Sequence, residues 1–280
     1  MDMAFDEFGV NMLDTAEMYP VPTKKETQGE TDRIISSWLA KRDRSKVILA
    51  TKVSGPGITW LPGRNGHASR VTAKEIIASV DFSLARLKTD YIDLLQIHWP
   101  DRYVPIFGGG AYNMSLEREA VSFEEQLKAM ETLIQAGKVR HFGVSNETPF
   151  GVMKFCSLAS ALNVPKPVSI QNSYSLLTRS DFESGLTEVC SPRNENVGLL
   201  AYSPLAGGIL TGKYFDPNVS PNCRLNLFQG YMARYKQSLS VEAVKRYCEV
   251  AAKFNLTPTE LALAWSYVQP HVTSTSKYAI

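Results

Sequence analysis

A chain of 280 residues, 44% hydrophobic and 21% charged, has the composition of an ordinary globular protein and is long enough for a single α/β barrel. Thirty basic against twenty-eight acidic residues give a net charge of +2, too balanced for a surface that neutralises nucleic-acid phosphates. The sequence shows no apolar stretch of membrane-spanning length and no basic, apolar leader, so it predicts a cytoplasmic protein with neither a nucleic-acid nor a membrane partner.

The four cysteines are far apart in the sequence and form no Cys-x-x-Cys motif. This spacing predicts neither a disulfide framework nor a zinc site, so no metal is expected. We interpret the thiols as buried or unreactive groups in a reducing compartment.

Short apolar runs recur along the chain, and each is followed by a loop and then by a helical pattern. The predicted strands are residues 11–15, 47–53, 92–98, 141–145, 168–172, 198–202 and 272–275. The predicted helices are residues 30–40, 72–87, 123–136, 148–162, a stretch around 180–189, 241–254 and 258–267. Because strands that alternate with helices pair in parallel, a parallel sheet buried on both faces is expected.

Two α/β folds fit seven such strands, a (β/α)8 TIM-type barrel and an open doubly wound sheet. No Gly-x-Gly-x-x-Gly follows an early predicted strand, which favours the barrel. The sequence has neither an internal repeat nor a Pro- or Ser-rich linker, so residues 1–280 are expected to form one domain. Long loops at residues 54–70, 100–121 and 213–236 follow strands and are expected on the C-terminal rim, where barrel active sites lie.

Polar side chains stand at the C-terminal ends of the predicted strands. Asp14 ends the first strand and Tyr19 follows it, Lys52 ends the second, and His98 ends the third. Each residue alone is more simply explained as a cap or a hydrogen-bonded core residue. A buried lysine, however, needs an anion and a buried aspartate needs a cation, and barrel strand ends converge on one mouth. The four side chains are therefore expected to form one cluster.

Such a cluster has the chemistry of a proton donor. A tyrosine hydroxyl has a reference pKa of about 10, so it donates a proton readily at neutral pH only if a nearby cation stabilises the phenolate. Lys52 is the predicted cation and Asp14 the group that holds it, while neutral His98 would orient the substrate oxygen. Tyr19 is then the predicted acid.

Three segments resemble the sequence blocks that hold the catalytic tetrad of the aldo-keto reductase family. They are Asn-Met-Leu-Asp-Thr-Ala-Glu-Met-Tyr at 11–19, Ala-Thr-Lys at 50–52 and Leu-Leu-Gln-Ile-His at 94–98. The resemblance implies that Asp14, Tyr19, Lys52 and His98 are catalytic residues of an oxidoreductase. This enzyme would transfer a hydride from NADPH to an aldehyde or ketone, or in reverse oxidise an alcohol, with Tyr19 as the proton donor.

Further segments resemble the parts of this family that bind NADP. They are Gly-Lys-Val-Arg-His-Phe-Gly-Val-Ser-Asn at 137–146, Gln-Asn at 171–172 and Tyr-Ser-Pro-Leu-Ala-Gly-Gly at 202–208. The resemblance implies that Ser145, Asn146 and Gln171 hold the carboxamide of the nicotinamide. It also implies a group of residues that stack on the ring or bind the pyrophosphate, namely Tyr202, Ser203, Pro204, Leu205, Ala206, Gly207, Lys213 and Arg224. An aromatic ring suits a flat heterocycle, and adjacent glycines let backbone amides approach phosphate oxygens.

The resemblance is greatest to the branch that contains the bacterial Tas protein and plant reductases, and it covers residues 1 to about 275. It departs from the family at both ends. The family's first barrel strand has no counterpart here, and residues 276–280 do not resemble the segment that grips the adenosine 2′-phosphate. The barrel is therefore expected to be incomplete, without its first strand and last helix, and the preference for NADP is implied by the family alone.

An alternative interpretation stays open at this point: an inactive truncated barrel, or a nucleotide-sensing binding protein resembling the potassium-channel β subunits, which share the fold. The carbonyl substrate would depend on the long loops. There Trp60, Arg64, Trp99 and Tyr112 are candidate pocket residues and equally candidate packing residues. No sequence feature indicates an oligomeric state.

Overall fold

The computed structural model describes residues 1–228, 230 and 232–276, and the chain divides into two compact units, Met1–Ile170 and Gln171–Ile280. The single domain expected from the sequence stays a prediction. Residues 277–280, most of the segment that departs from the 2′-phosphate motif, lie outside the described residues. None of the helices in the described part of the chain is long and apolar enough to cross a membrane.

Unit 1 is built on parallel strands that pair in chain order. They are β1 (Met12–Asp14), β2 (Ile48–Val53), β3 (Ile92–Ile97) and β4 (Val139–Ser145). The register places Asp14 opposite Ala50 and Lys52 opposite Gln96. All of β3 and nearly all of β2 are buried, which matches strands whose side chains are covered on both faces of a sheet.

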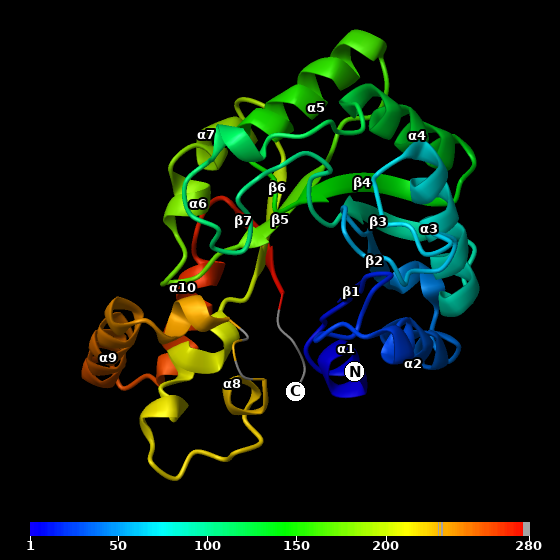
Figure 1. Ribbon diagram of the computed structural model, residues 1–280. Coiled ribbons are helices and arrows are strands. Elements are labelled where there is room, and N and C mark those ends of the chain that lie inside the picture. The colour runs from blue at the N-terminus through cyan, green and yellow to red at the C-terminus, as the bar shows by residue number, and fades with distance from the viewer. Residues whose placement is uncertain (229, 231, 277–280) are drawn as a thin grey trace. The chain divides into compact units, whose positions relative to one another are not determined.

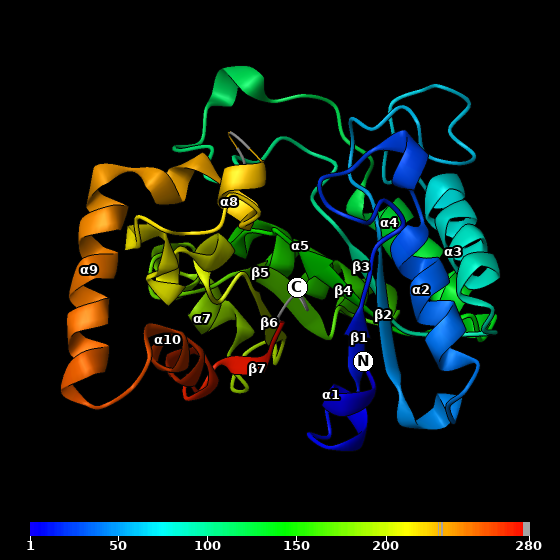
Figure 2. The same ribbon diagram turned by 90° about the horizontal axis from the view of Figure 1, so that it is seen from below.

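Helices connect these strands and cover one face of them. They are α2 (Glu30–Leu39), α3 (Ala73–Leu87), α4 (Phe123–Gln135) and α5 (Pro149–Leu162), while the short helix α1 (Asp2–Asp6) precedes β1. Helices α2, α3 and α4 stand side by side outside β1 to β4 (Figures 1 and 2). The side chains of Thr72, Ser122 and Thr148 cap α3, α4 and α5 by accepting a backbone N–H, so three of the predicted helix starts have a local chemical cause.

Part of the core of unit 1 forms where α2 and α3 pack on β2. Ile35, Trp38 and Leu39 lie on one face of α2 because their spacing follows the helical period, and they pack with Leu49 and Leu87. Burying each of these large side chains contributes about 1.5–3 kcal/mol. This packing fixes the strands whose C-terminal ends carry the predicted site.

A charged cluster ties together the opposite, N-terminal ends of β2, β3 and β4. Asp93 accepts hydrogen bonds from Arg44 at 2.7 Å, from Arg140 at 2.8 Å and from the Leu49 N–H at 3.0 Å. The ring of Tyr91 has both guanidinium carbons 4.0 Å from its centre. This cluster joins three strands at the end away from the site, where barrel residues serve stability.

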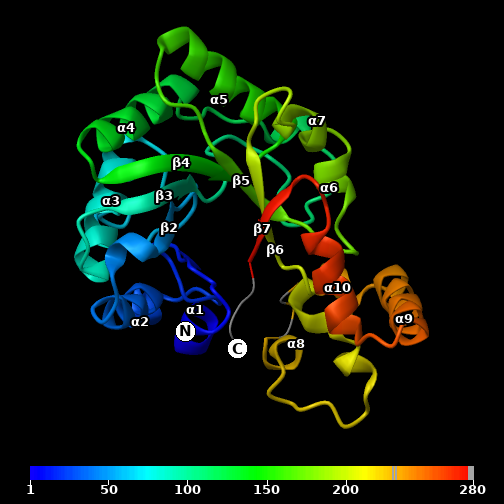
Figure 3. The same cartoon turned by 180° about the vertical axis from the view of Figure 1, so that it is seen from behind.

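Unit 2 holds strands β6 (Gly198–Tyr202) and β7 (Val272–Thr275), which pair in parallel with a bulge between Leu199 and Leu200. Strand β5 (Ser169–Ser173) begins in unit 1, and just after its end the Tyr174 N–H donates to the Tyr202 carbonyl at 3.1 Å within unit 2. The helices of unit 2 are α6 (Ser180–Glu183), α7 (Leu186–Cys190), α8 (Arg224–Leu227), α9 (Ser238–Lys253) and α10 (Pro258–Tyr267). Figure 3 shows α9 and α10 packed beside each other, with α10 leading into β7.

Short 3₁₀ helices complete the described elements. They are η1 (Lys25–Thr27), η2 (Arg44–Lys46), η3 (Met114–Leu116), η4 (Ala206–Thr211), η5 (Lys213–Phe215) and η6 (Ala233–Lys236). A helix follows every strand from β1 to β6, so the element order is that of the predicted α/β fold of the TIM-barrel type, and the seven expected strands are all present. The predicted stretch around residues 180–189 is two helices, because Gly185 has an extended φ of −178° and interrupts it.

Candidate active site

The four side chains predicted to form a cluster come together in unit 1, at the C-terminal ends of its strands. Lys52 Nζ donates to Asp14 Oδ2 at 2.6 Å and lies 5.0 Å from the centre of the Tyr19 ring. The rings of Tyr19 and His98 meet edge to face, with their centres 5.6 Å apart. The structure therefore brings an ammonium, a carboxylate, a phenol and an imidazole into one small region.

Strand register explains why Asp14 and Lys52 meet. Asp14 is the last residue of β1 and lies opposite Ala50, and Lys52 is two residues beyond Ala50 on the same face of β2. A four-carbon side chain that runs back along this face reaches the carboxylate. Lys52 Nζ also donates to the Thr15 carbonyl at 2.9 Å, so the ammonium is held by the residue after β1 as well.

Tyr19 is placed by a turn that follows β1. Its N–H donates to the Ala16 carbonyl at 3.0 Å, and its own carbonyl accepts from the Gly29 N–H at 2.9 Å, at the start of α2. The backbone is therefore held on both sides of the phenol. The ring, which is partly exposed, is presented to Lys52 and His98 without belonging to a strand.

Burial gives the ion pair its electrostatic weight. The Lys52 side chain is 0% exposed and that of Asp14 is 18% exposed, so neither charge is fully hydrated. In such surroundings a charge is tolerated only beside an opposite charge or several hydrogen-bond partners. Lys52 has Asp14 and the Thr15 carbonyl, and this arrangement keeps a positive charge next to the phenol.

His98 follows β3 and is a neutral group in this cluster. Burial holds the pKa of its imidazole well below the ordinary value of 6.5, and the nearby charge of Lys52 lowers it further. Trp99 lies against it, with ring centres 5.1 Å apart. A neutral imidazole beside a phenol serves as a hydrogen-bond partner for a polar ligand and not as a strong acid.

The His98 imidazole is expected to stay neutral when the pH is lowered through 6.5 in the folded protein. Since unfolding returns this group to a pKa of about 6.5, the unfolded chain takes up a proton that the native chain refuses, and His98 makes the free energy of unfolding fall as the pH drops below that value. Nitrogen-15 NMR of the imidazole checks the first statement. In His98→Gln, the free energy of unfolding should depend less on pH in this window; a native His98 signal that titrates near 6.5 would contradict the expectation.

Ser145 and Asn146 stand at the end of β4, beside His98. The Asn146 amide donates to the His98 carbonyl at 2.8 Å and to Ser145 Oγ at 3.1 Å. Asn146 has a φ of +53°, a left-handed conformation that asparagine tolerates better than most residues. The two predicted nicotinamide ligands of unit 1 are thus adjacent to the tetrad.

In unit 2, the segment after β6 turns sharply through a left-handed backbone. Ser203, Ala206, Gly207 and Gly208 have φ values of +57°, +47°, +70° and +97°. A Cβ on Gly208 would lie 3.6 Å from Lys213 Nζ, so the ammonium stands over this turn. Left-handed turns with a cation beside them are typical of sites for phosphate oxygens, and these residues therefore fit a cofactor that carries a pyrophosphate.

Other predicted cofactor ligands of unit 2 belong to the same and neighbouring elements. Gln171 is buried in β5, Tyr202 ends β6 and is partly buried, and Arg224 begins α8. A Cβ on Gly207 would lie 2.8 Å from the sulfur of Met232, closer than real Cβ atoms approach. The positive φ favours glycine at this position, and a larger residue would have to displace the Met232 side chain.

Comparison with known proteins decides the family. The family described as "Aldo/keto reductase family" matches residues 1–276 of the chain. The chain belongs to the aldo-keto reductase family. It is 45% identical to an "Aldo-keto reductase" of Babesia bovis over 245 residues, which cover 82% of this chain and 84% of that protein. It is 44% identical to "Protein tas" of Escherichia coli K12 over 268 residues, which cover 95% of this chain and 76% of that protein.

A more distant relative carries a different kind of name. The chain is 30% identical over 273 residues, 96% of its length and 71% of the relative, to a "Putative voltage-gated potassium channel subunit beta" of Schizosaccharomyces pombe. The resemblance of this aldo-keto reductase to the branch that contains Tas, inferred from its sequence blocks, is confirmed. Membership of the family identifies the chain as a relative of oxidoreductases.

Gln96 is a neighbour of the tetrad that sequence reasoning missed in this aldo-keto reductase. It is 0% exposed, pairs in register with Lys52, and its amide donates to Asp14 Oδ1 at 3.2 Å. Asp14 thus has one charged and one neutral partner. The signal was present in Leu-Leu-Gln-Ile-His, because a glutamine two residues before His98 in an apolar strand shares its face.

The candidate pocket residues Trp99, Tyr112 and Arg64 of the long loops have different surroundings in the structure. Trp99 packs against Gly55, where a Cβ would lie 2.2 Å from its ring, and its indole N–H donates to the Pro56 carbonyl at 3.2 Å. Trp99 is thereby fixed beside His98. Tyr112 is exposed, and the Arg64 side chain is buried in ion pairs with Glu17 and Glu75, so Arg64 does not offer its charge to a ligand.

Asp101 fastens the ends of two long loops. Its carboxylate accepts hydrogen bonds from Arg70, the shortest at 2.6 Å, and others from the N–H groups of Val71 at 2.8 Å and Val121 at 2.9 Å. Burial alone would raise the pKa of Asp101, but these donors outweigh it and lower the pKa below its ordinary value. The loops after β2 and β3 are therefore anchored where they meet α3 and α4.

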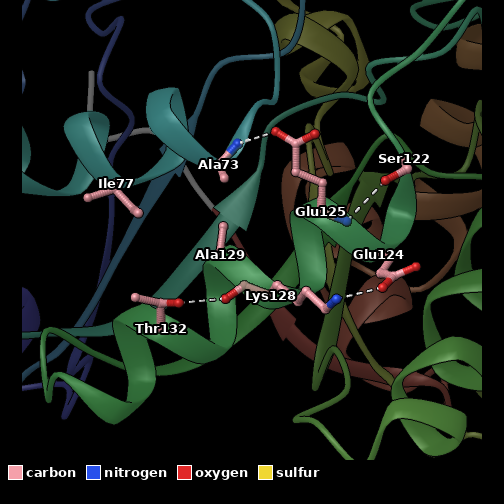
Figure 4. Close-up of a pocket in the computed structure, with 8 residues that line it drawn as sticks. All are labelled: Ala73, Ile77, Ser122, Glu124, Glu125, Lys128, Ala129 and Thr132. Atoms are coloured by element: carbon pink, nitrogen blue, oxygen red, sulfur yellow. Dashed lines mark hydrogen bonds and ion pairs between the residues drawn. The ribbon is translucent and has the colours of Figure 1, made fainter.

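A hollow of about 390 Å³ lies away from the tetrad, between α3 and α4 (Figure 4). Its wall includes Ala73, whose N–H donates to Glu125 at 2.8 Å, and Lys128, which pairs with Glu124 at 2.6 Å. None of the predicted catalytic residues lines it. The polar groups named here pair with one another within the wall. We do not assign the hollow to the active site.

Proposed function

We propose that this aldo-keto reductase uses NADPH to reduce an aldehyde or ketone, with the reverse oxidation of an alcohol, and that Tyr19 donates the proton. The observation that carries the proposal is the buried Lys52–Asp14 pair, whose ammonium lies 5.0 Å from the centre of the Tyr19 ring. A cation placed there stabilises the phenolate that remains after proton donation.

Each member of the tetrad has one task in this mechanism. NADPH, when bound, supplies the hydride. Tyr19 gives its hydroxyl proton to the carbonyl oxygen, Lys52 stabilises the resulting phenolate, and Asp14 keeps Lys52 in place and charged. Neutral His98 donates a hydrogen bond to the same carbonyl oxygen and orients it, and the ring of Trp99 offers an apolar surface to the rest of the substrate.

The cofactor ligands are proposed from the family resemblance and from local geometry in each unit. In unit 1, Ser145 and Asn146 would bind the carboxamide of the nicotinamide. In unit 2, Gln171 would do the same, and Tyr202 would stack on the ring. The pyrophosphate would be bound by the turn after β6 and its cations, namely Ser203, Pro204, Leu205, Ala206, Gly207, Lys213 and Arg224. The preference for NADP over NAD is taken from the family.

The remaining features of the proposal follow from the same chemistry. The partner is a small carbonyl compound, because the phenol, imidazole and indole of Tyr19, His98 and Trp99 offer two polar groups and one flat apolar surface. All four cysteines are free, which supports a reducing compartment, and we place the enzyme in the cytoplasm. Residues 1–280 would act as one catalytic domain.

Titration of the purified chain with NADPH and with NADH, followed by nicotinamide fluorescence, tests the proposal. We expect saturable binding that is tighter for NADPH, and NADPH-dependent turnover of an aldehyde. Lys213→Met should weaken binding by about tenfold, because one charged contact to a phosphate contributes about 1–2 kcal/mol. A chain that unfolds cooperatively yet binds neither nucleotide would refute the proposal.

A second function is kept because of one relative. The Schizosaccharomyces pombe protein that is 30% identical to this chain is named as a potassium-channel β subunit. Saturable NADPH binding with no turnover of any aldehyde or ketone would favour a nucleotide-dependent binding protein of that kind. Turnover that Tyr19→Phe abolishes would favour the reductase.

A further inference from the structure

The loop between β2 and α3 buries a guanidinium between two carboxylates, next to the tetrad. The Arg64 side chain is 0% exposed; its Nη2 donates to Glu17 Oε1 at 3.2 Å, and its Nε lies 2.8 Å from Glu75 Oε2. Its Nη1 donates to the Pro62 carbonyl at 3.1 Å. Glu17, Arg64 and Glu75 are called the Arg64 network below.

Glu17 joins this network to the strand that carries Lys52. The carboxylate of Glu17 is 2% exposed and accepts the Ser54 N–H at 2.7 Å, just beyond the end of β2. The Glu17 N–H donates to the Lys52 carbonyl at 3.1 Å. One residue therefore binds the end of β2 twice, through its backbone and through its side chain.

Glu17 also belongs to the turn that presents Tyr19. It lies two residues before the phenol, and its carbonyl accepts the side-chain amide of Gln28, while the Tyr19 carbonyl accepts the Gly29 N–H at 2.9 Å. The turn is thus held between β2 on one side and the start of α2 on the other. Any displacement of Glu17 moves the backbone from which the Tyr19 ring projects.

The charged groups of the Arg64 network hold one another in fixed positions. One guanidinium faces two carboxylates, and the excess negative charge is met by backbone donors: Ser54 N–H on Glu17 and Arg70 N–H on Glu75 at 2.9 Å. Removing either partner of a buried pair leaves an uncompensated charge, so the surrounding loop has to rearrange. Glu17 belongs to the Tyr19 turn and contacts that loop through Ser54 and Arg64.

We propose that Glu17 and Arg64 are positioning residues for proton transfer, which hold the Tyr19 phenol at its distance from Lys52. The inference rests on the proposed function and deepens it. Both act through the backbone of the Tyr19 turn and the end of β2. A misplacement of about 1 Å is enough to cost on the order of 10²-fold in rate.

Three variants and one matched control test this proposal. Glu17→Gln keeps an oxygen for the Ser54 N–H but removes the charge, Arg64→Met removes the guanidinium, and Arg64→Lys restores a cation. Asp93→Asn is the control, because it also breaks a buried pair, with Arg44 at 2.7 Å, but at the N-terminal ends of the strands. All four proteins are first compared by thermal unfolding, so that changes in rate are read against similar losses of stability.

We expect kcat to fall about 10- to 100-fold in Glu17→Gln and Arg64→Met, with KM and the Kd for NADPH changed less than about threefold, and Arg64→Lys to recover part of the loss. The cofactor-free protein gives a second readout. The Tyr19 phenol, followed by carbon-13 NMR of labelled tyrosine and assigned with Tyr19→Phe, should ionise about one pH unit higher in the two disruptive variants than in the wild type.

The outcomes separate this inference from the proposed function. If Asp93→Asn loses as much kcat as Glu17→Gln at equal stability, or if the Tyr19 ionisation is the same in all variants, the network is only a structural brace and the inference is wrong. If the wild type reduces no carbonyl, the proposed function fails, and the NMR titration still decides whether Glu17 and Arg64 set the surroundings of the phenol.

Discussion

Replacing Tyr19 by phenylalanine is expected to lower kcat for carbonyl reduction by about 10²- to 10⁴-fold, the usual contribution of a positioned acid. The ring remains, so its edge-to-face contact with His98, 5.6 Å between centres, can persist in the variant. The variant removes the hydroxyl group and with it the transferable proton. Since Tyr19 is not among the proposed cofactor ligands, the Kd for NADPH should change less than about threefold, so the loss appears in kcat and in kcat/KM alike.

Turnover kinetics with an aldehyde measure kcat and kcat/KM. A fluorescence titration measures the Kd for NADPH. Tyr112→Phe is the matched control, because it removes a hydroxyl from an exposed ring that hydrogen-bonds only Glu117 in the contacts described for it, at 3.1 Å. We expect the control to keep wild-type turnover. Undiminished turnover in Tyr19→Phe would mean that another group supplies the proton, and the assignment of the acid would be wrong.

The strands were predictable because their causes are local. Buried runs such as Ile92–Ile97 are rich in isoleucine and leucine, although Asp93 and Gln96 interrupt this one, and polar residues follow where the chain leaves the sheet. The apolar pattern predicts a start at residue 141 for β4, two residues after Val139, where the strand begins. Arg140 and His141 are exposed, and Arg140 pairs with Asp93, a residue 47 positions away, so the apolar pattern there is broken by a tertiary contact.

The pairing of Asp14 with Lys52 was predictable from charge alone, since each needs the other if both are buried. The partnership of Gln96 with Asp14 was not, because it depends on the register between β2 and β3. Arg64 was harder still. It lies in a loop without periodicity, 47 residues from Glu17, and only the folded loop shows that its charge is buried.

The segment after β6 shows a further limit of sequence reasoning. Gly207 and Gly208 indicate a backbone conformation that other residues rarely adopt, and both have positive φ. Ser203 and Ala206 also have positive φ, of +57° and +47°, which no residue type at those positions indicates. Non-glycine residues in this conformation cost about 1–3 kcal/mol each and tend to occur where a ligand is bound, in agreement with the proposed pyrophosphate site.

Lys52→Met is expected to abolish measurable reduction and to lower the free energy of unfolding by about 3 kcal/mol near neutral pH. Methionine has nearly the shape of the lysine stem, so the core of β2 stays filled. The Asp14 carboxylate, however, keeps only the Gln96 amide at 3.2 Å among its partners named here, in a place that is 18% exposed. Activity and stability therefore fall together, and the single variant alone cannot tell a catalytic lysine from a structural one.

The double variant Asp14→Asn/Lys52→Met separates the two roles. Asparagine removes the unpaired charge and still offers an oxygen to Gln96, so most of the lost stability should return, while reduction stays absent because no cation lies near the Tyr19 phenol. Denaturant unfolding and aldehyde turnover on wild type, both single variants and the double variant complete the cycle. A double variant that regains turnover with its stability would show that Lys52 only supports the fold.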